Sequence, residues 1–189
     1  MKLKSVIDQI ERIGNLIRSE EKKLISGQRL QPVHVQVLKY LSICNKYSNT
    51  PMAVSSYIGN TKGTTSQTLI VLEENGYINK EQNKRDKRGV NLFLTVKGKK
   101  LLNKLSKIYI KQDLSLTGIE ETEKFLDSFL KYLQKSNSFR TFGACRTCRY
   151  FLTEDTGFRC GLTKEILKPD ETSLICYEHE DEIKINLVN

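Results

Sequence analysis

Apolar residues recur every three or four positions along most of the first 135 residues, a spacing that places them on one face of a helix. Pro32 stands near the first turn of the second such segment, where its missing N–H costs nothing, and Ser26-Gly27 ends the first. The pattern predicts a mostly helical fold, with helices over residues 3–25, 32–47, 51–58, 61–75, 97–110 and 119–135.

A short hairpin interrupts this helical pattern. Residues 77–81 and 90–96 contain β-forming residues and are joined by a segment that includes Gly89, where the chain can reverse. Upstream, Gly59-Asn60 allows a tight turn between two helices, which is the spacing of a helix-turn-helix. We therefore predict a winged helix-turn-helix, mostly α with a small β-hairpin wing.

The last part of the chain differs from the rest in composition. Residues 137–189 are turn-rich and hold four of the five cysteines. We predict two parts, a domain of residues 1–136 with its winged core at about 30–100, and a C-terminal segment of residues 137–189. Because this segment has few apolar side chains, we expect a metal rather than a core to order it.

Positive charge is concentrated in one stretch of the sequence. The 189 residues carry a formal net charge of +9, and residues 78–111 alone hold 11 basic and 2 acidic side chains. Residues 112–189 hold 10 basic and 14 acidic side chains, so lysines are not simply scattered for solubility. A localised basic stripe predicts a polyanionic partner and binding that weakens with salt.

The helix predicted over 61–75 and the hairpin after it suit a DNA duplex. A short helix that presents small polar groups fits the major groove, and a cationic hairpin tip can reach phosphates or the adjacent minor groove. The partner we expect is therefore double-stranded DNA. The candidate DNA-binding residues are Lys62, Thr64, Ser66, Gln67, Lys84, Arg85, Lys87 and Arg88.

The cysteines of the C-terminal segment have the spacing of a ligand set, Cys145-x2-Cys148-x11-Cys160-x15-Cys176. A Cys-x2-Cys turn places two thiolates on one cation, and two later cysteines complete a tetrahedral Zn²⁺ site. The same four thiolates suit an iron–sulfur cluster such as [4Fe–4S], and free or disulfide-forming thiols are the third interpretation. His179 could replace one ligand, whereas Cys44 lies on the apolar face of its helix and is interpreted as a core residue.

The segment from Leu30 to Leu102 resembles the MarR family of bacterial winged-helix regulators. The resemblance rests on Pro32 to Leu41, on residues 61–67 and 72–78 at the two ends of one helix, on Asp86-Lys87-Arg88, and on residues 94–98. It implies a MarR-like homodimer with interlocked terminal helices, bound to a pseudo-palindromic operator, with Arg88 in the minor groove and Asp86 bracing it. Gln67 stands where many relatives have an arginine, and the cysteines lie beyond the usual end of the family.

Catalysis has little support in the sequence. The two histidines lie outside any nucleophile motif, and no phosphate-binding glycine loop or paired-acid motif is present. We expect a transcriptional repressor rather than an enzyme, with a structural or sensory metal centre. The alternative is a metal- or redox-dependent protein-interaction or electron-transfer module with the winged helix as scaffold. Without a membrane-spanning apolar run or a signal peptide, we expect a cytoplasmic protein on the nucleoid DNA of a bacterium. The sequence leaves open whether a small-molecule or redox effector regulates the protein.

Overall fold

The computed structural model describes residues 2–83, 89–109, 117–137 and 140–181. The predicted hairpin tip, Lys84 to Arg88 with Asp86, lies outside the described residues. None of the helices in the described ranges is both long and apolar enough to span a bilayer. The first 136 residues form, in order, α1 (Lys2–Leu24), α2 (Pro32–Ile43), α3 (Pro51–Ile58), α4 (Lys62–Glu74), β1 (Ile78–Gln82), β2 (Val90–Leu94), α5 (Val96–Tyr109) and α6 (Ile119–Ser136).

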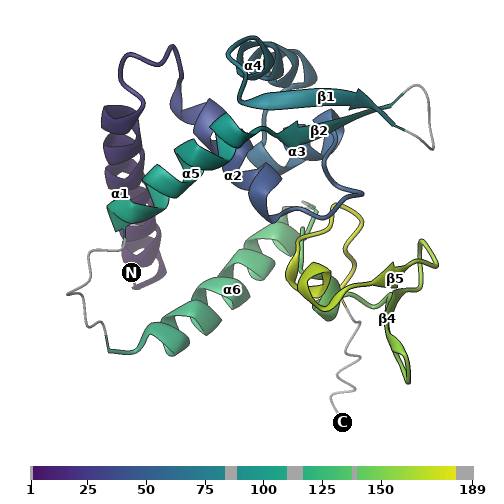
Figure 1. The fold of residues 1–189 in the computed structure, drawn as a ribbon. Coiled ribbons are helices and arrows are strands. Elements are labelled where there is room, and N and C mark those ends of the chain that lie inside the picture. The colour runs from purple at the N-terminus through teal and green to yellow at the C-terminus, as the bar shows by residue number, and fades with distance from the viewer. Residues whose placement is uncertain (1, 84–88, 110–116, 138–139, 182–189) are drawn as a thin grey trace.

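Helices α2 to α5 and the β1–β2 hairpin form a winged helix-turn-helix (Figure 1). The two strands are antiparallel, with Ile78 opposite Leu94. One apolar cluster holds these elements together, because side chains from each of them are fully or almost fully buried. Its members include Val35, Leu38, Val54, Leu69, Leu72, Ile78, Leu92 and Leu105.

The turn between α3 and α4 forms where the sequence predicted it. The Thr50 side chain accepts a hydrogen bond from Ala53 N–H at the start of α3, and Thr61 caps α4 through Thr64 N–H at 3.2 Å. Such a cap is worth about 1 kcal/mol. Gly59 ends α3 with φ of 76°, a left-handed conformation that glycine adopts without strain.

The predicted end of α2 near Tyr47 is wrong, because the helix ends at Ile43. Cys44 is extended, with φ of −81° and ψ of 151°, and forms a parallel bridge with Ile175. Asn45 N–H donates to Ile175 O at 2.9 Å, and Ile175 N–H donates to Ile43 O at 2.9 Å. Pairing with the C-terminal segment therefore takes the hydrogen bonds that the next helical turn would have made.

The C-terminal segment (residues 140–181) is an irregular unit with a small antiparallel sheet in the order β3-β4-β5. Its elements are η1 (Cys145–Thr147), β3 (Phe151–Glu154), β4 (Gly157–Cys160), β5 (Ile166–Leu167) and η2 (Pro169–Ser173). Phe142 and Tyr177 belong to the same apolar cluster as the winged core, and the Phe142 ring lies 6.1 Å from that of Tyr40 and 5.2 Å from that of Tyr57. The expectation that the segment lacks a core is wrong, since it shares the core of the winged domain.

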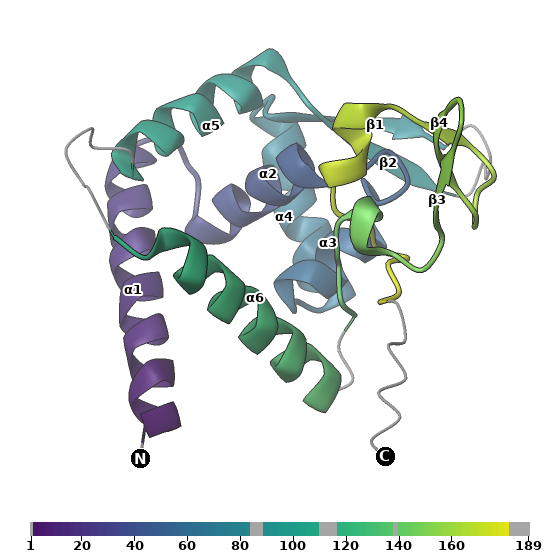
Figure 2. The same cartoon turned by 90° about the horizontal axis from the view of Figure 1, so that it is seen from below.

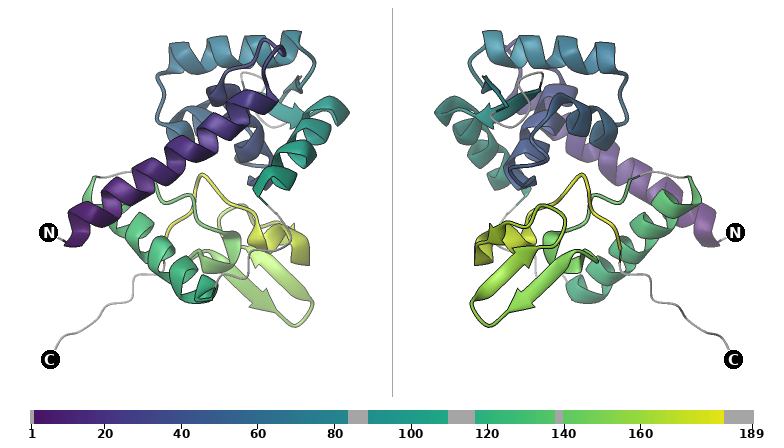
Figure 3. Two further views of the ribbon diagram at one scale, coloured as in Figure 1. Left: turned by 90° about the vertical axis from the view of Figure 1, so that its left-hand side faces the viewer. Right: turned by 90° about the vertical axis from the view of Figure 1, so that its right-hand side faces the viewer.

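Helices α1 and α6 extend away from this core (Figures 2 and 3). The C-terminal end of α1 packs beside α2, where Glu21 and Ile25 are buried. Toward its N-terminus, however, α1 exposes Leu3, Ile13 and Leu16. No residue of α6 is buried among those described, although the helix is strongly amphipathic. Two long apolar faces are therefore left uncovered in the single chain.

Candidate nucleic-acid interface and cysteine cluster

One side of α4 packs on the core and the other is open to solvent. Thr65, Thr68, Leu69 and Leu72 are buried, a three-to-four-residue spacing that fixes the rotation of the helix. Three of the predicted DNA-binding residues share the exposed side of its N-terminal half. They are Lys62, Ser66 and Gln67.

Gly63 lies on the same exposed side. A Cβ built at this position would meet no atom within 4 Å. Figure 1 shows α4 along the edge of the molecule opposite the C-terminal segment. The arrangement leaves the backbone of the first turn open to close approach by a partner.

Thr64, also predicted to contact DNA, has a structural role in the start of α4. Its side chain is exposed, but its Oγ1 lies 2.9 Å from Thr61 Oγ1, and its N–H donates to that same oxygen. The residue thus belongs to the N-cap as well as to the exposed surface. Residues 61–64 are exposed, so the partial positive charge of the helix N-terminus faces solvent, where it favours an anion such as phosphate.

Lys97 connects the end of α4 to the start of α5. Its Nζ donates to Asn75 O at 2.7 Å and lies 4.4 Å from the centroid of the Tyr77 ring. A cation at a helix C-terminus stabilises the helix dipole, so Lys97 links the end of α4 to α5. Sequence reasoning placed this lysine in the basic stripe and in the MarR-like motif of residues 94–98, but could not predict its contact with Asn75, because that carbonyl is 22 residues away in the chain.

The four predicted metal-binding cysteines line one cavity of about 40 Å³, here called the cysteine cavity. Cys145 and Cys148 come from the η1 turn, where Cys148 N–H donates to Cys145 O at 3.0 Å. Cys160 ends β4, and Cys176 follows the bridging residue Ile175. The remaining wall is mainly apolar and includes Tyr150, Phe151, Leu162 and Leu167. The four cysteines that the sequence spacing grouped thus come from η1, the residue after it, the end of β4 and the chain after η2.

Hydrogen bonding shifts the pKa values of two of these thiols in opposite directions. The Cys145 thiol donates to the Cys176 sulfur, which raises the pKa of Cys145, and burial raises it further. The same bond lowers the pKa of Cys176 to about 6, and Asn45 and the Glu178 N–H also donate to this sulfur. Asn45 Nδ2 lies 3.5 Å from Cys145 Sγ as well. Among the described residues, no three His, Cys, Asp or Glu side chains are placed to hold a single metal ion.

His179 does not belong to the cysteine cavity. Its Nδ1 lies 2.7 Å from Thr141 Oγ1 and its Nε2 lies 3.0 Å from Thr147 Oγ1, so both ring nitrogens have protein partners. A Cβ on Gly143 would overlap the imidazole ring, which explains a glycine at that position. The histidine is therefore a buried residue held by two threonines, and it is not among the residues that line the cysteine cavity.

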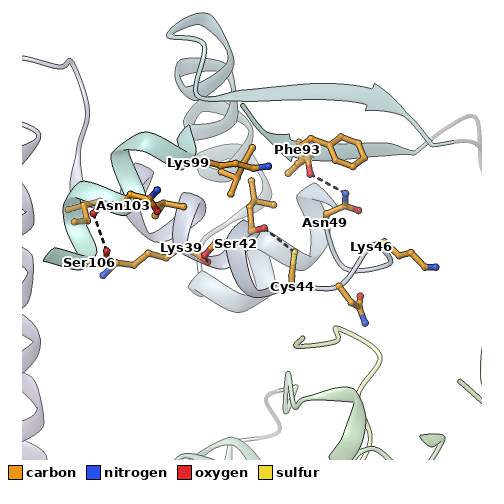
Figure 4. A pocket seen from close by; sticks show the side chains of 15 residues that line it. Lys39, Ser42, Cys44, Lys46, Asn49, Phe93, Lys99, Asn103 and Ser106 are labelled. Atoms are coloured by element: carbon orange, nitrogen blue, oxygen red, sulfur yellow. Dashed lines mark hydrogen bonds between the residues drawn. The ribbon is translucent and has the colours of Figure 1, made fainter. Parts of the chain in front are cut away.

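A larger open pocket of about 870 Å³ lies between α2, β2 and α5. Figure 4 shows Lys39, Cys44 and Asn49 along one side of it and Lys99 of α5 on the other. Burial raises the pKa of Cys44 to about 12, in keeping with its predicted core role. Asn45 lines both this pocket and the cysteine cavity. Sequence reasoning missed this position, because its environment depends on distant segments.

Comparison with known proteins places the fold. No model of a protein family matches the chain. The HTH-type transcriptional regulator BilQ of Clostridioides difficile (strain CD3) is 34% identical over 98 residues, which are 51% of this chain and 63% of that protein. The match therefore spans somewhat less than two thirds of that relative.

Two solved structures share the architecture at low sequence identity. A MarR transcriptional regulator from Methanosarcina mazei Go1 superposes with a TM-score of 0.57 at 22% identity, covering 71% of this chain and 97% of that one. A MarR protein from Peptoclostridium difficile DA00132 gives 0.54 at 21% identity, covering 69% and 88%. The predicted MarR-like winged-helix fold is confirmed.

Proposed function

We propose that this chain is a MarR-type transcriptional regulator that binds double-stranded DNA and acts as a repressor. The observation that carries the proposal is the exposed N-terminal half of α4, which presents Lys62, Ser66 and Gln67 beside an open glycine backbone. These side chains match the donor and acceptor pattern of base edges in a major groove. The fold and the sequence similarity to a helix-turn-helix regulator support the same conclusion.

The hairpin provides the second contact in this proposal. Residues 78–111 hold 11 basic and 2 acidic side chains, so the wing and α5 carry charge suited to a phosphate backbone. Lys84, Arg85 and Lys87 would then lie near phosphates. Arg88 would enter the minor groove, where a neighbouring carboxylate such as Asp86 pre-positions a guanidinium.

A homodimer on a pseudo-palindromic operator follows from α1 and α6. Leu16 of α1 is 62% exposed, and Phe125 and Leu130 of α6 are 50% and 54% exposed. Exposed apolar faces of this length are typical of surfaces that a partner covers, and a two-fold axis makes contact with a second copy of the chain self-complementary. The two α4 helices of the dimer would face successive major grooves, one helical turn apart.

The C-terminal segment contributes a metal centre in this proposal. All four thiols line one cavity, and two of them are already linked by a hydrogen bond. Zinc would give the centre a structural role, whereas an iron–sulfur cluster would also allow it to act as a sensor.

The DNA-binding proposal is tested by selecting duplexes from a random pool and measuring affinity by fluorescence anisotropy. We expect an inverted repeat with half-sites about ten base pairs apart. The logarithm of the affinity should also fall linearly with that of the salt concentration. If no sequence is enriched, or if affinity is insensitive to salt, the chain does not read DNA in this way.

A further inference from the structure

We infer that the cleft between α4 and the wing binds the sugar–phosphate chain of one DNA strand. This role rests on the proposed function and deepens it, because it gives the same DNA partner a second contact surface beside the exposed side of α4. The cleft, here called the strand cleft, has a volume of about 440 Å³ and lies between the start of α3, the N-terminal half of α4 and the two strands of the hairpin. Figure 1 shows α4 beside β1.

The geometry of a duplex places a DNA strand in this position. A major groove and the neighbouring minor groove are separated by one sugar–phosphate chain. If α4 occupies the major groove and the wing occupies the adjacent minor groove, that chain must cross the space between them. The strand cleft is this space, because Ser66 of α4 and Lys80 of β1 both line it. The exposed side of α4 continues into the cleft, since Lys62 and Ser66 belong to both.

The charges of the strand cleft complement those of a phosphate chain. Lys62 of α4 and Lys80 of β1 line the cleft, and none of the described residues that line it is acidic. Lys80 Nζ lies 2.7 Å from Glu73 Oε2, and 26% of the lysine side chain is exposed. An ammonium group has three N–H donors, so this ion pair holds Lys80 at the cleft and leaves donors for a phosphate oxygen.

The start of α3 offers both an apolar surface and a donor to the same strand. Met52 is 55% exposed and lines the cleft together with Val90 of β2. A deoxyribose ring presents mainly C–H groups, so it can pack on these side chains while the phosphates on either side reach the lysines. The Met52 N–H is one of the first N–H groups of α3, which have no acceptor within the helix and favour an anion.

A buried hydroxyl in the wall of the strand cleft has no partner. Thr65 is 3% exposed and lines the cleft, yet its Oγ1 makes no hydrogen bond among the described residues. Thr68 shows the ordinary arrangement, because its Oγ1 donates to Thr64 O at 2.9 Å. An unpaired buried hydroxyl destabilises a fold, and a phosphate oxygen in the cleft would supply the acceptor. A threonine in a helix has two favoured χ1 rotamers, so rotation can turn this hydroxyl toward the bound strand.

Asn49 holds two walls of the strand cleft together. Its Nδ2 donates to Leu92 O at 3.1 Å, and Leu92 N–H donates to Asn49 O at 2.7 Å. Leu92 lies two residues after Val90 in β2, and Asn49 lies two residues before Pro51 at the start of α3. The two walls are therefore hydrogen-bonded to each other, and preorganisation of this kind lowers the cost of ordering the protein on binding.

The test replaces single phosphates of the selected duplex by uncharged methylphosphonates, one position at a time, and measures affinity by fluorescence anisotropy. We expect wild type to lose roughly five-fold or more in affinity at one or two adjacent positions on the strand between the two grooves. A variant with Lys80→Met and Glu73→Gln should bind the unmodified duplex more weakly and lose little more at those positions. Glu73→Gln alone is the matched control, because it keeps the cation, and it should respond like wild type.

Thr65→Val tests the hydroxyl separately. It should weaken binding about three- to ten-fold and leave thermal stability equal or higher, because a methyl group replaces an unpaired buried hydroxyl. Thr68→Val is the matched control on the same helix and should bind like wild type, since the Thr68 hydroxyl donates within the helix and the residue does not line the cleft.

Selective binding of the duplex, with no phosphate position whose loss disappears in the Lys80 variant, would overturn the strand cleft and leave recognition by α4 intact. Wild-type affinity in Thr65→Val would overturn the role of its hydroxyl. If wild type bound no duplex at all, the proposed function itself would fail, and the strand cleft with it.

Discussion

At the scale of single residues, α4 has buried side chains that stabilise the fold and exposed side chains that are available to contact a partner. Thr65 and Thr68 are buried, whereas Ser66 and Gln67, which lie between them in the sequence, are exposed. Substitutions on the exposed side therefore probe binding without opening the core. This separation makes the proposed DNA contacts testable one residue at a time.

Gly63→Leu should weaken operator binding at least ten-fold without lowering thermal stability. No atom lies within 4 Å of the position that a Cβ would take, so the fold can accept a side chain there. A DNA duplex bound against α4 would collide with that side chain. Anisotropy and thermal melting of the same preparation measure the two effects. Asn103→Leu on α5 is the control, and a Gly63→Leu variant that binds like wild type would place the duplex elsewhere.

Gln67→Ala should cost about 1–3 kcal/mol of binding to the selected operator and relax the preference at one base pair. Lys62→Ala should instead weaken binding to all sequences alike if its ammonium contacts phosphate. Repeating the duplex selection with each variant distinguishes the two roles. An unchanged motif with Gln67→Ala would remove this residue from base recognition.

His34 should make the fold sensitive to acid. Burial lowers its pKa below the ordinary 6.5, and its Nδ1 accepts a hydrogen bond from Gln31 N–H at 2.7 Å. The unfolded chain therefore binds more protons as the pH falls through about 6.5, so the free energy of unfolding decreases from there toward lower pH. Urea unfolding at pH 7.5 and 5.5 measures the loss, which His34→Gln should reduce; an equal loss in that variant would assign it to other groups.

At the scale of elements, α1 and α6 are unlike the helices of the winged core. Both expose apolar side chains along much of their length, and Phe125 and Phe129 of α6 stack with ring centroids 5.9 Å apart. A helix of this kind gains most of its stability from packing on a partner rather than from its own propensity. The dimer proposed here provides that partner.

Leu130→Glu in α6 should shift the chain from dimer to monomer at micromolar concentration, because it places a carboxylate in the apolar face. Sedimentation velocity measures the change, and operator binding should weaken with it. Lys124→Glu, which changes charge on the opposite face of the same helix, should remain dimeric. A wild-type chain that sediments as a monomer would rule out this interface.

At the scale of the whole molecule, the C-terminal segment and the winged core share one apolar cluster. Phe142 meets Tyr40 and Tyr57 edge-on, and its ring centroid lies 5.6 Å from that of Tyr177. Arg140 also lies over the Tyr177 ring, with Cζ 4.0 Å from its centroid. The two parts are therefore expected to unfold together rather than independently.

Phe142→Ala should lower the free energy of unfolding by about 3–5 kcal/mol, because it removes an aromatic ring from a shared core. Phe142→Leu should cost less, since it fills part of the same space. Urea unfolding followed by circular dichroism and by tyrosine fluorescence should give one coincident transition in wild type. Two separated transitions would show that the C-terminal segment folds on its own.

Much of the winged core follows from local sequence alone. The caps at Thr50 and Thr61 and the left-handed Gly59 lie within a few residues of the helices they bound, so propensity and periodicity suffice to locate them. The exposed side of α4 follows for the same reason, since the buried residues repeat at helical spacing. The cysteine spacing likewise identified the residues that line one cavity.

Tertiary contacts decided what local pattern could not. Helix α2 stops at Ile43 because Ile175, more than 130 residues later, takes its next hydrogen bonds, and no local signal at residues 44–47 reports that pairing. Phe142 and Tyr177 enter the core from a segment too poor in apolar residues to show periodicity. The contact between Asn45 and Cys145 was also beyond sequence reasoning, because a hydrogen bond between residues 100 positions apart exists only once the chain has folded.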